Sequence, residues 1–166
     1  MAETNSFDIT STIDMQEVDN AINQARKEVA QRYDFKGSTA AIELDQKANT
    51  LTLSAEDAFR LEALWEILAT RMVRRNVAVK NLKRGDVEPA SAGTVRQVIT
   101  LQMGIPSEAA RDIVKHLKDL KLKKVQASIQ GDQVRVSSPS KDELQGAMSA
   151  LRAKDFGIAL QFGNYR

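Results

Sequence analysis

Short runs of alternating apolar and polar residues along this chain are separated by longer stretches with an apolar repeat of helical spacing. Residues 6–13 alternate as a strand does, and residues 14–32 carry apolar side chains on one face behind a capping aspartate. Residues 40–53 contain two more alternating runs around a polar turn and predict a hairpin. A helix is predicted from about residue 55 to 75, and a short strand over 77–82.

The second half of the chain repeats this order after residues 83–93, whose Gly, Pro and Ser content predicts a linker. The predicted elements are a strand at 95–103, a helix over 105–120, a hairpin with strands at 125–129 and 134–136 around Gly131-Asp132, a helix capped by Ser140, and a closing strand at 158–162. The order strand-helix-strand-strand-helix-strand therefore occurs twice. It predicts an α+β protein of two tandem ferredoxin-like (βαββαβ) domains, residues 1–90 and 91–166, each an antiparallel sheet with helices on one face.

The hairpin of the second domain separates apolar from polar residues by strict alternation. Val125, Ala127, Ile129, Val134 and Val136 are predicted to face the core. The opposite, open face is predicted to hold Lys124, Gln126, Ser128, Gln130, Gln133, Arg135 and Ser137, with Gln161 from the last strand and Lys121 and Lys123 just before the sheet. Amide and guanidinium groups hydrogen-bond phosphates and base edges, but an ordinary solvated sheet face carries the same residue types. Both interpretations remain open on the pattern alone.

Charge distribution favours the second half of the chain as the anion-binding side. The whole chain of 166 residues has a net charge of +2, divided into −3 for residues 1–90 and +5 for residues 91–166. No apolar run approaches the roughly 20 residues of a membrane span, and the N-terminus lacks the pattern of a signal peptide. The chain contains no cysteine, which suits a reducing compartment, so we expect a cytoplasmic protein without membrane contact.

Residues for catalysis or metal binding are not grouped in this sequence. His116 is the single histidine, and without cysteine it supports neither a catalytic dyad nor a zinc site. No glycine-rich phosphate loop occurs, and acidic pairs such as Asp142-Glu143 stand at helix starts, where capping explains them. We therefore expect no catalytic residues, no bound metal, no cofactor and no enzymatic activity.

Aromatic residues stand at the ends of the predicted elements instead of on the central strands. An RNA-recognition motif has the same element order but stacks bases on aromatics of its two central strands, where this chain has Gln, Ser, Lys and Arg. Tyr33, Phe35, Phe156 and Tyr165 are the candidates for stacking a base, and each can equally cap a hydrophobic core.

Several segments of the chain resemble the YajQ family of small bacterial proteins. The matching segments are SFDI (6–9), RYDFKG (32–37), KLKKVQASIQGDQVRV (121–136), SKDELQ (140–145) and LRAKDFGIALQFGNYR (151–166). Residues 77–102 match least, and Ser91-Ala92-Gly93-Thr94 lacks a lysine that family members usually carry there. Asp34 and Lys36 fall in the RYDFKG segment and join Tyr33 and Phe35 as candidates for stacking or edge contacts.

The resemblance implies that the two domains exchange their first strands. The strand at 6–13 would complete the sheet of the C-terminal hairpin, and the strand at 95–103 would join the N-terminal elements. It also implies a non-catalytic nucleotide-binding protein, a regulatory effector that binds cyclic di-GMP, or GTP, ATP, tRNA or other RNA. The alternative is an adaptor that contacts a transcription regulator without binding nucleotide. If the protein binds cyclic di-GMP, guanine edges would be held by Arg, Gln or Asp, and phosphates by Lys121, Lys123, Lys124 or Arg135. Oligomeric state is left open.

Overall fold

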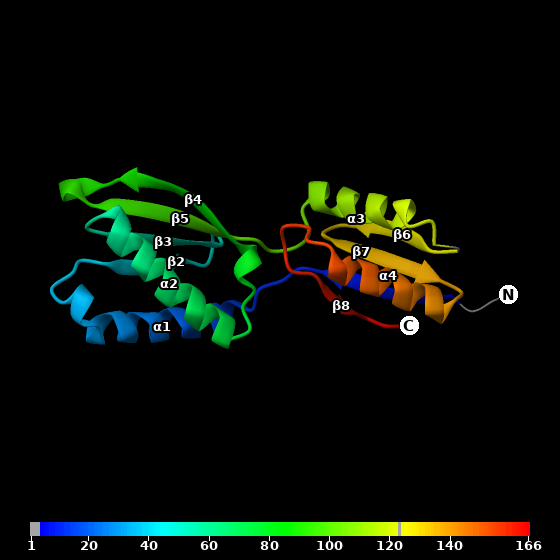
Figure 1. Cartoon of the computed structure of the whole chain (residues 1–166), viewed down its shortest axis with the longest axis horizontal. Coiled ribbons are helices and arrows are strands. Elements are labelled where there is room, and N and C mark those ends of the chain that lie inside the picture. The colour runs from blue at the N-terminus through cyan, green and yellow to red at the C-terminus, as the bar shows by residue number, and fades with distance from the viewer. Residues whose placement is uncertain (1–3, 123) are drawn as a thin grey trace. The chain divides into compact units, whose positions relative to one another are not determined.

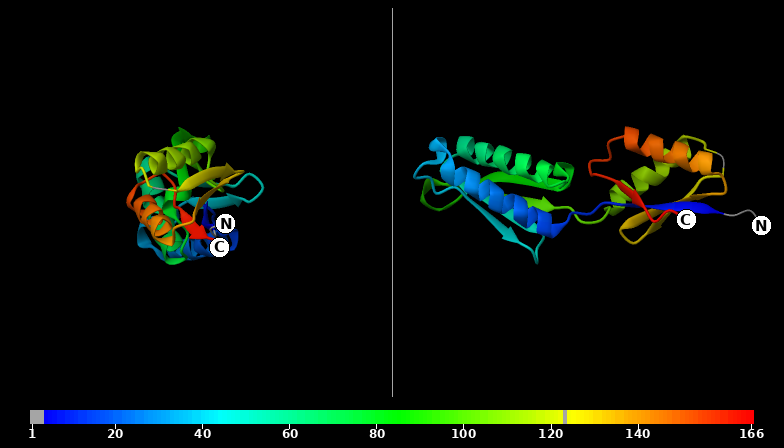
Figure 2. Two further views of the ribbon diagram at one scale, coloured as in Figure 1. Left: turned by 90° about the vertical axis from the view of Figure 1, so that its right-hand side faces the viewer. Right: turned by 90° about the horizontal axis from the view of Figure 1, so that it is seen from below.

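The computed structural model describes residues 4–122 and 124–166 and divides the chain into two compact units. The continuous unit is Ile13–Gln102, and the split unit combines Met1–Thr12 with Met103–Arg166. Within the described residues, each unit has one four-stranded antiparallel sheet with two helices on one of its faces (Figures 1 and 2). The predicted α+β class with two ferredoxin-like halves is confirmed.

The continuous unit carries its sheet in the order β2-β3-β5-β4. Its elements are α1 (Met15–Gln31), the 3₁₀ turn η1 (Tyr33–Phe35), β2 (Ala41–Asp45), β3 (Thr50–Ala55), α2 (Ala58–Arg74), η2 (Val79–Asn81), β4 (Leu82–Pro89), η3 (Ser91–Gly93) and β5 (Val95–Leu101). Asp14 caps α1 by accepting from the backbone N–H of Gln16, and Asp57 caps α2 in the same manner. The buried face of α2 packs on the apolar sides of β3 and β5, and α1 packs against α2 and β2.

The split unit carries its sheet in the order β6-β7-β1-β8. Its elements are β1 (Asn5–Thr10), α3 (Ser107–Asp119), β6 (Gln126–Gln130), β7 (Gln133–Ser138), α4 (Lys141–Ala153) and β8 (Gln161–Gly163). The first strand of the chain thus lies between β7 and β8, while β5 lies between β3 and β4. Because Phe7 pairs with Val136 and Ile9 with Val134, both strands present their apolar residues to the same side.

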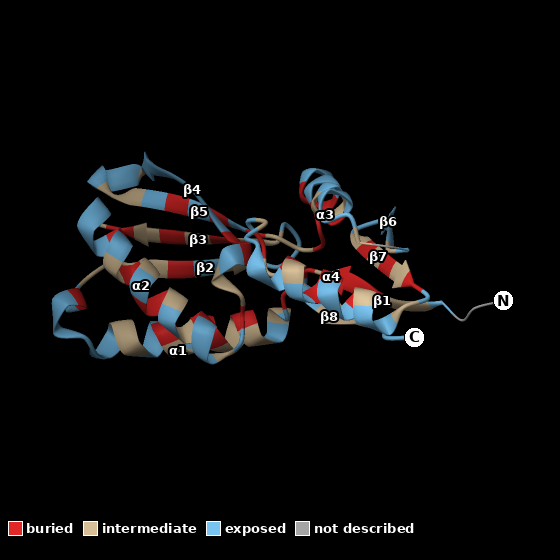
Figure 3. Ribbon diagram, turned by 45° about the vertical axis from the view of Figure 1, so that its right-hand side comes forward, coloured by how far each residue is buried: buried red, intermediate tan, exposed pale blue. Residues whose placement is uncertain are grey.

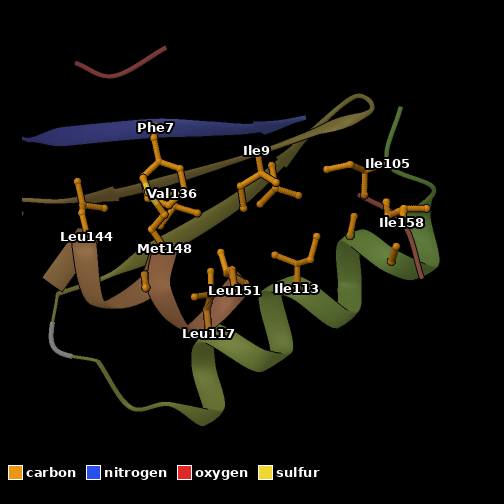
Figure 4. Close-up of a cluster of buried hydrophobic side chains, with 14 residues drawn as sticks. Phe7, Ile9, Ile105, Ile113, Leu117, Val136, Leu144, Met148, Leu151 and Ile158 are labelled. Carbon is orange, nitrogen blue, oxygen red and sulfur yellow. The ribbon is translucent and has the colours of Figure 1, made fainter. Parts of the chain in front are cut away.

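Those apolar residues form the core of the split unit together with α3 and α4. Phe7 and Ile9 from β1 meet Met148 and Leu151 from α4 and Ile113 from α3 (Figure 4). The ring of Phe162 on β8 packs edge-on against Phe7, with ring centroids 5.7 Å apart. The opposite face of this sheet carries the polar residues of the same strands, and no helix covers it in the described chain.

Two predictions in the middle of the chain were wrong. Residues 79–81 form a 3₁₀ turn instead of a strand, and most of the predicted linker is the strand β4, which pairs with β5 as far as Pro89. A register shift between Arg84 and Val87 accommodates Gly85, so the glycine and proline that indicated a linker belong to an edge strand with a bulge. No helix of residues 4–122 and 124–166 is long and apolar enough to cross a membrane.

Three further predictions differ in detail from the structure, and a fourth falls on a residue outside the described ones. Ile129 lies on the apolar side of the sheet, as predicted, because it pairs with the buried Val134, but it is not buried: β6 is an edge strand, and 47% of this residue's surface is exposed. The closing strand is confined to Gln161–Gly163, although Ile158 before it is buried as predicted. Ala55 ends β3, and the helix predicted from there begins three residues later, behind its cap. Lys123 lies outside the described residues.

Candidate functional site

Two aromatic side chains of the continuous unit project into solvent at one open cavity. Tyr33 on η1 is 89% exposed and Phe59 in the first turn of α2 is 84% exposed. The cavity has a volume of about 560 Å³ and is called here the Tyr33–Phe59 cleft. Its lining residues are Tyr33, Asp34, Phe35, Lys36, Phe59, Arg60 and Ala63. A single exposed apolar side chain is ordinary, but two large exposed rings at one cavity form the kind of apolar patch that marks interaction sites, so the cleft is a candidate binding site.

The segment after α1 folds so that Tyr33 and Lys36 point outward. α1 ends at Gln31, and the backbone N–H of Lys36 donates to the carbonyl of Tyr33 at 3.1 Å, which closes a 3₁₀ turn. Phe35 is only 5% exposed and anchors this turn in the core. Gly37 then reverses the chain at a φ of +72°, a backbone conformation that favours glycine.

Glu56 joins the two walls of the cleft. Its carboxylate accepts hydrogen bonds from the Ser38 hydroxyl at 2.7 Å and from the hydroxyl and backbone N–H of Thr39. Glu56 directly precedes Asp57, the cap of α2, so these bonds tie the loop after η1 to the start of that helix. The hydrogen bond from Ser38, with those from Thr39, lowers the pKa of Glu56 to about 2 against the opposing effect of burial.

The charges around the cleft are partly paired. Arg32 donates to both carboxylate oxygens of Asp34 at 2.9 and 2.8 Å, and this hydrogen bonding lowers the pKa of Asp34. Arg60 lies 2.6 Å from the Asp57 carboxylate. Lys36 is exposed and has no ion-pair partner among the described residues. The cleft therefore offers one unpaired cation, a second cation in an exposed ion pair, and two aromatic faces.

The open face of the split unit's sheet has a buried carboxylate at its centre. Asp8 on β1 accepts from Arg135 on β7 at 2.9 Å and from the Asn164 amide at 3.0 Å. The hydrogen bond from Arg135, followed by that from Asn164, lowers the pKa of Asp8 although burial opposes the charge. Arg135, predicted as a phosphate contact, is thus held by a carboxylate in this structure.

The other residues predicted on this face lie where the alternation placed them. Gln126 pairs with Ser137 and Gln130 with Gln133 across β6 and β7, so their side chains share the open face. Lys121 and Lys124 are exposed in the loop before β6, both with left-handed backbone conformations. The Gln161 amide instead hydrogen-bonds the hydroxyl and backbone of Thr12 at 2.9 to 3.1 Å.

The remaining candidates do not join these groups into one site. Phe156 packs edge-on against His116 at 5.9 Å and beneath Lys154, which indicates a packing role. Tyr165 is 61% exposed near the C-terminus, in the split unit. The four candidates from Tyr33 to Lys36 lie in the continuous unit and the rest in the split unit. Among the described residues, no cluster of His, Cys, Asp and Glu could hold a metal ion.

Two residues important to these surfaces were missed by reasoning from sequence. Phe59 stands two positions before Leu61, about 200° around the helix from the buried stripe, and a large apolar residue in that position was the available signal. Asp8 was assigned to a polar strand face, and its partner Arg135 is 127 positions away in the chain. Only the pairing of β1 with β7 brings them together.

Comparison with known proteins places the whole chain in one family. The family model described as nucleotide-binding protein YajQ-like matches residues 5–166. A nucleotide-binding protein of Chloroherpeton thalassium is 51% identical over 166 residues, which is 100% of both chains. Another, of Solibacter usitatus, is 54% identical over 162 residues, covering 98% of this chain and 97% of the relative. A third, of Carboxydothermus hydrogenoformans, is 48% identical over 166 residues and 100% of both chains. The chain therefore belongs to the YajQ-like family of nucleotide-binding proteins.

Proposed function

We propose that this protein binds a nucleotide without catalysing its conversion, and that the Tyr33–Phe59 cleft is the binding site. The observation that carries this proposal is the pair of aromatic side chains, each more than four-fifths exposed, at one cavity beside Lys36 and Arg60. Any nucleobase can stack on such rings, because every base has a flat π-face whatever hydrogen-bonding groups its edge carries. The lysine and arginine supply charge-assisted hydrogen bonds to a phosphate.

Each part of the cleft has a separate role in this proposal. The rings of Tyr33 and Phe59 hold the base. Lys36 contacts the phosphate directly, and Arg60 does so by leaving its exposed ion pairs with Asp57 and Glu56. Asp34 lies beside the base, where its carboxylate can accept from a guanine edge once it turns from Arg32. Cyclic di-GMP, GTP, ATP and single-stranded RNA all contain the base and phosphate that this arrangement requires.

The open face of the split unit is a second candidate surface, suited to nucleic acid. Gln126 and Gln130 carry exposed amides there and Gln133 a half-buried one, Lys121 and Lys124 lie in the loop before β6, and the five side chains present donors without a stacking ring. Such a surface favours contacts with a phosphodiester backbone over capture of a single base. Binding there would weaken steeply with salt concentration, whereas base stacking in the Tyr33–Phe59 cleft would depend on salt much less.

Titration calorimetry with cyclic di-GMP, GTP, ATP and a short single-stranded RNA tests the proposal. The Phe59→Ala and Tyr33→Ala variants should each weaken binding by about tenfold or more, the effect of losing one stacking ring. Val73→Ala, which removes another exposed apolar side chain from the same helix, is the matched control and should bind as the wild type does. Absence of heat with all four ligands, or an affinity equal to that of the wild type in both ring variants, would contradict the proposal.

The adaptor alternative gives a different result in the same experiment. An adaptor without a nucleotide site would bind none of the ligands and would still be recovered with its transcription regulator. The adaptor role would be favoured if the Phe59→Ala variant still recovered the transcription regulator and if calorimetry gave no heat with any of the four ligands. A sensitive phosphate-release assay on GTP and ATP should also give no turnover if the protein is not an enzyme.

A further inference from the structure

The edge strands of the two sheets are protected to very different degrees. In the described chain the edges are β2 and β4 in the continuous unit and β6 and β8 in the split unit. An edge strand exposes unpaired backbone N–H and C=O groups, which can add a strand from another chain. Proteins usually prevent such addition with charged residues, proline, bulges, short strands or a covering side chain.

Three of these edges carry at least one of those protections. β2 contains Glu43 and Asp45, and the Arg26 guanidinium covers its backbone by donating to the carbonyl of Ile42 at 3.2 Å. β4 has four charged residues, a register shift and a terminal Pro89. β8 is only three residues long.

The fourth edge, β6, lacks these protections. Its sequence, Gln126-Ala-Ser-Ile-Gln130, contains no charged residue and no proline, and its pairing with β7 runs without a register shift. It is largely exposed, as Figure 3 shows, and 47% of the Ile129 surface faces solvent on the apolar side of the sheet. Apolar surface of this kind on an unprotected edge is typical of a strand that acquires a partner.

We propose that β6 pairs antiparallel with the β6 strand of a second copy of this chain, about a two-fold axis at Ser128. The strand is self-complementary in that arrangement, because its pattern of polar and apolar residues is the same from either end. Gln126 would oppose Gln130 of the second copy on the open face, which allows amide-to-amide hydrogen bonds. On the other face Ala127 would oppose Ile129, so the exposed isoleucine is covered.

Charges at the two ends of β6 select the antiparallel orientation. Lys124 precedes the strand and Asp132 follows it, and both residues are exposed. Antiparallel pairing brings each lysine near the second copy's aspartate at both ends of the contact. Parallel pairing would bring like charges together at each end. A two-fold axis also closes the assembly at two copies, because each chain uses its β6 edge once.

The contact covers a single strand, so the dimer should form reversibly with rising protein concentration. Sedimentation equilibrium of the full chain over a wide concentration range should show a mass that approaches twice that of one chain. Ser128→Lys places two ammonium groups opposite each other at the axis and should weaken dimerisation by about tenfold or more. Ser128→Glu should do the same, and an equal mixture of the two variants should restore the dimer because the charges are then opposite.

Glu43→Lys, a charge change on the β2 edge, is the matched control and should leave dimerisation unchanged. Thermal melts of the three variants should coincide with that of the wild type, which separates loss of pairing from loss of folding. A wild-type mass that stays at one chain throughout, a Ser128→Lys protein that dimerises as the wild type does, or a mixture that stays monomeric would overturn the proposal.

Discussion

Glu56 should contribute measurably to stability through its bonds to the loop after η1, and Glu56→Gln is the perturbation that tests this. The glutamine keeps the size of the side chain and one acceptor but removes the charge. In the folded protein the pKa of Glu56 is about 2, compared with 4.5 for an unperturbed glutamate. Because the folded-state pKa is lowered, the contribution is complete above about pH 4.5 and is lost as the pH falls toward 2.

The magnitude follows from the shift and the exposure of the side chain. A shift of about 2.5 pH units corresponds to about 3 kcal/mol at 1.36 kcal/mol per unit. The Glu56 side chain is 33% exposed, so solvent screening reduces this value. We expect Glu56→Gln to lower the free energy of unfolding by about 1.5 kcal/mol at pH 7.

Urea denaturation at several pH values, followed by fluorescence, measures this difference. Trp65 is the single tryptophan and lies on α2 in the same unit, so it reports unfolding of the relevant part of the chain. The difference between wild type and Glu56→Gln should shrink as the pH falls from 4.5 toward 2. The control Glu66→Gln, an exposed carboxylate on α2, should change stability little at any pH. A difference below about 0.3 kcal/mol at pH 7, or one independent of pH, would refute the reasoning.

Three other perturbations have defined outcomes. Asp8→Asn weakens the bond to Arg135 and should destabilise the protein by about 2 kcal/mol in urea denaturation, the effect of losing a hydrogen-bonded buried charge. Gly104→Ala should lower the melting temperature, because φ is +80° there and the new Cβ would lie 2.6 Å from a carboxylate in the β6–β7 turn. If RNA binds the open face of the split unit, replacing Lys121 and Lys124 with alanine should reduce the slope of log affinity against log salt by about 1.4, as measured by filter binding.

Periodicity was sufficient for the helices and for the inner strands of the fold. The stripe at Leu61, Leu64 and Leu68 and the alternation at Val134 and Val136 each have one interpretation, and the structure buries all five residues. Such patterns say which face is buried but not which strand lies alongside. The position of β1 between β7 and β8 depends on contacts between distant parts of the chain, and so did the pairing of Asp8 with Arg135.

Edge strands and turns were the least predictable parts. Ile129 alternates like a core residue, yet at the edge of the sheet too few neighbours remain to cover it. Gly85 and Pro89 indicated a linker because both interrupt a regular strand, although an edge strand with a bulge tolerates them. At the candidate site, the RYDFKG segment identified one wall of the cleft from sequence. The other wall, with Phe59 and Arg60, required the folded structure.

Chemical-shift mapping by NMR tests the central claim most directly, because it locates the nucleotide on the protein. A ¹⁵N-labelled sample would be titrated with whichever of cyclic di-GMP, GTP, ATP or short RNA gives heat in calorimetry. The account predicts that the largest shifts fall on the amides of Tyr33, Lys36 and Phe59 and that the Phe59→Ala variant loses them. Shifts confined to the amides of 126–137, with those of the Tyr33–Phe59 cleft unchanged, would contradict it.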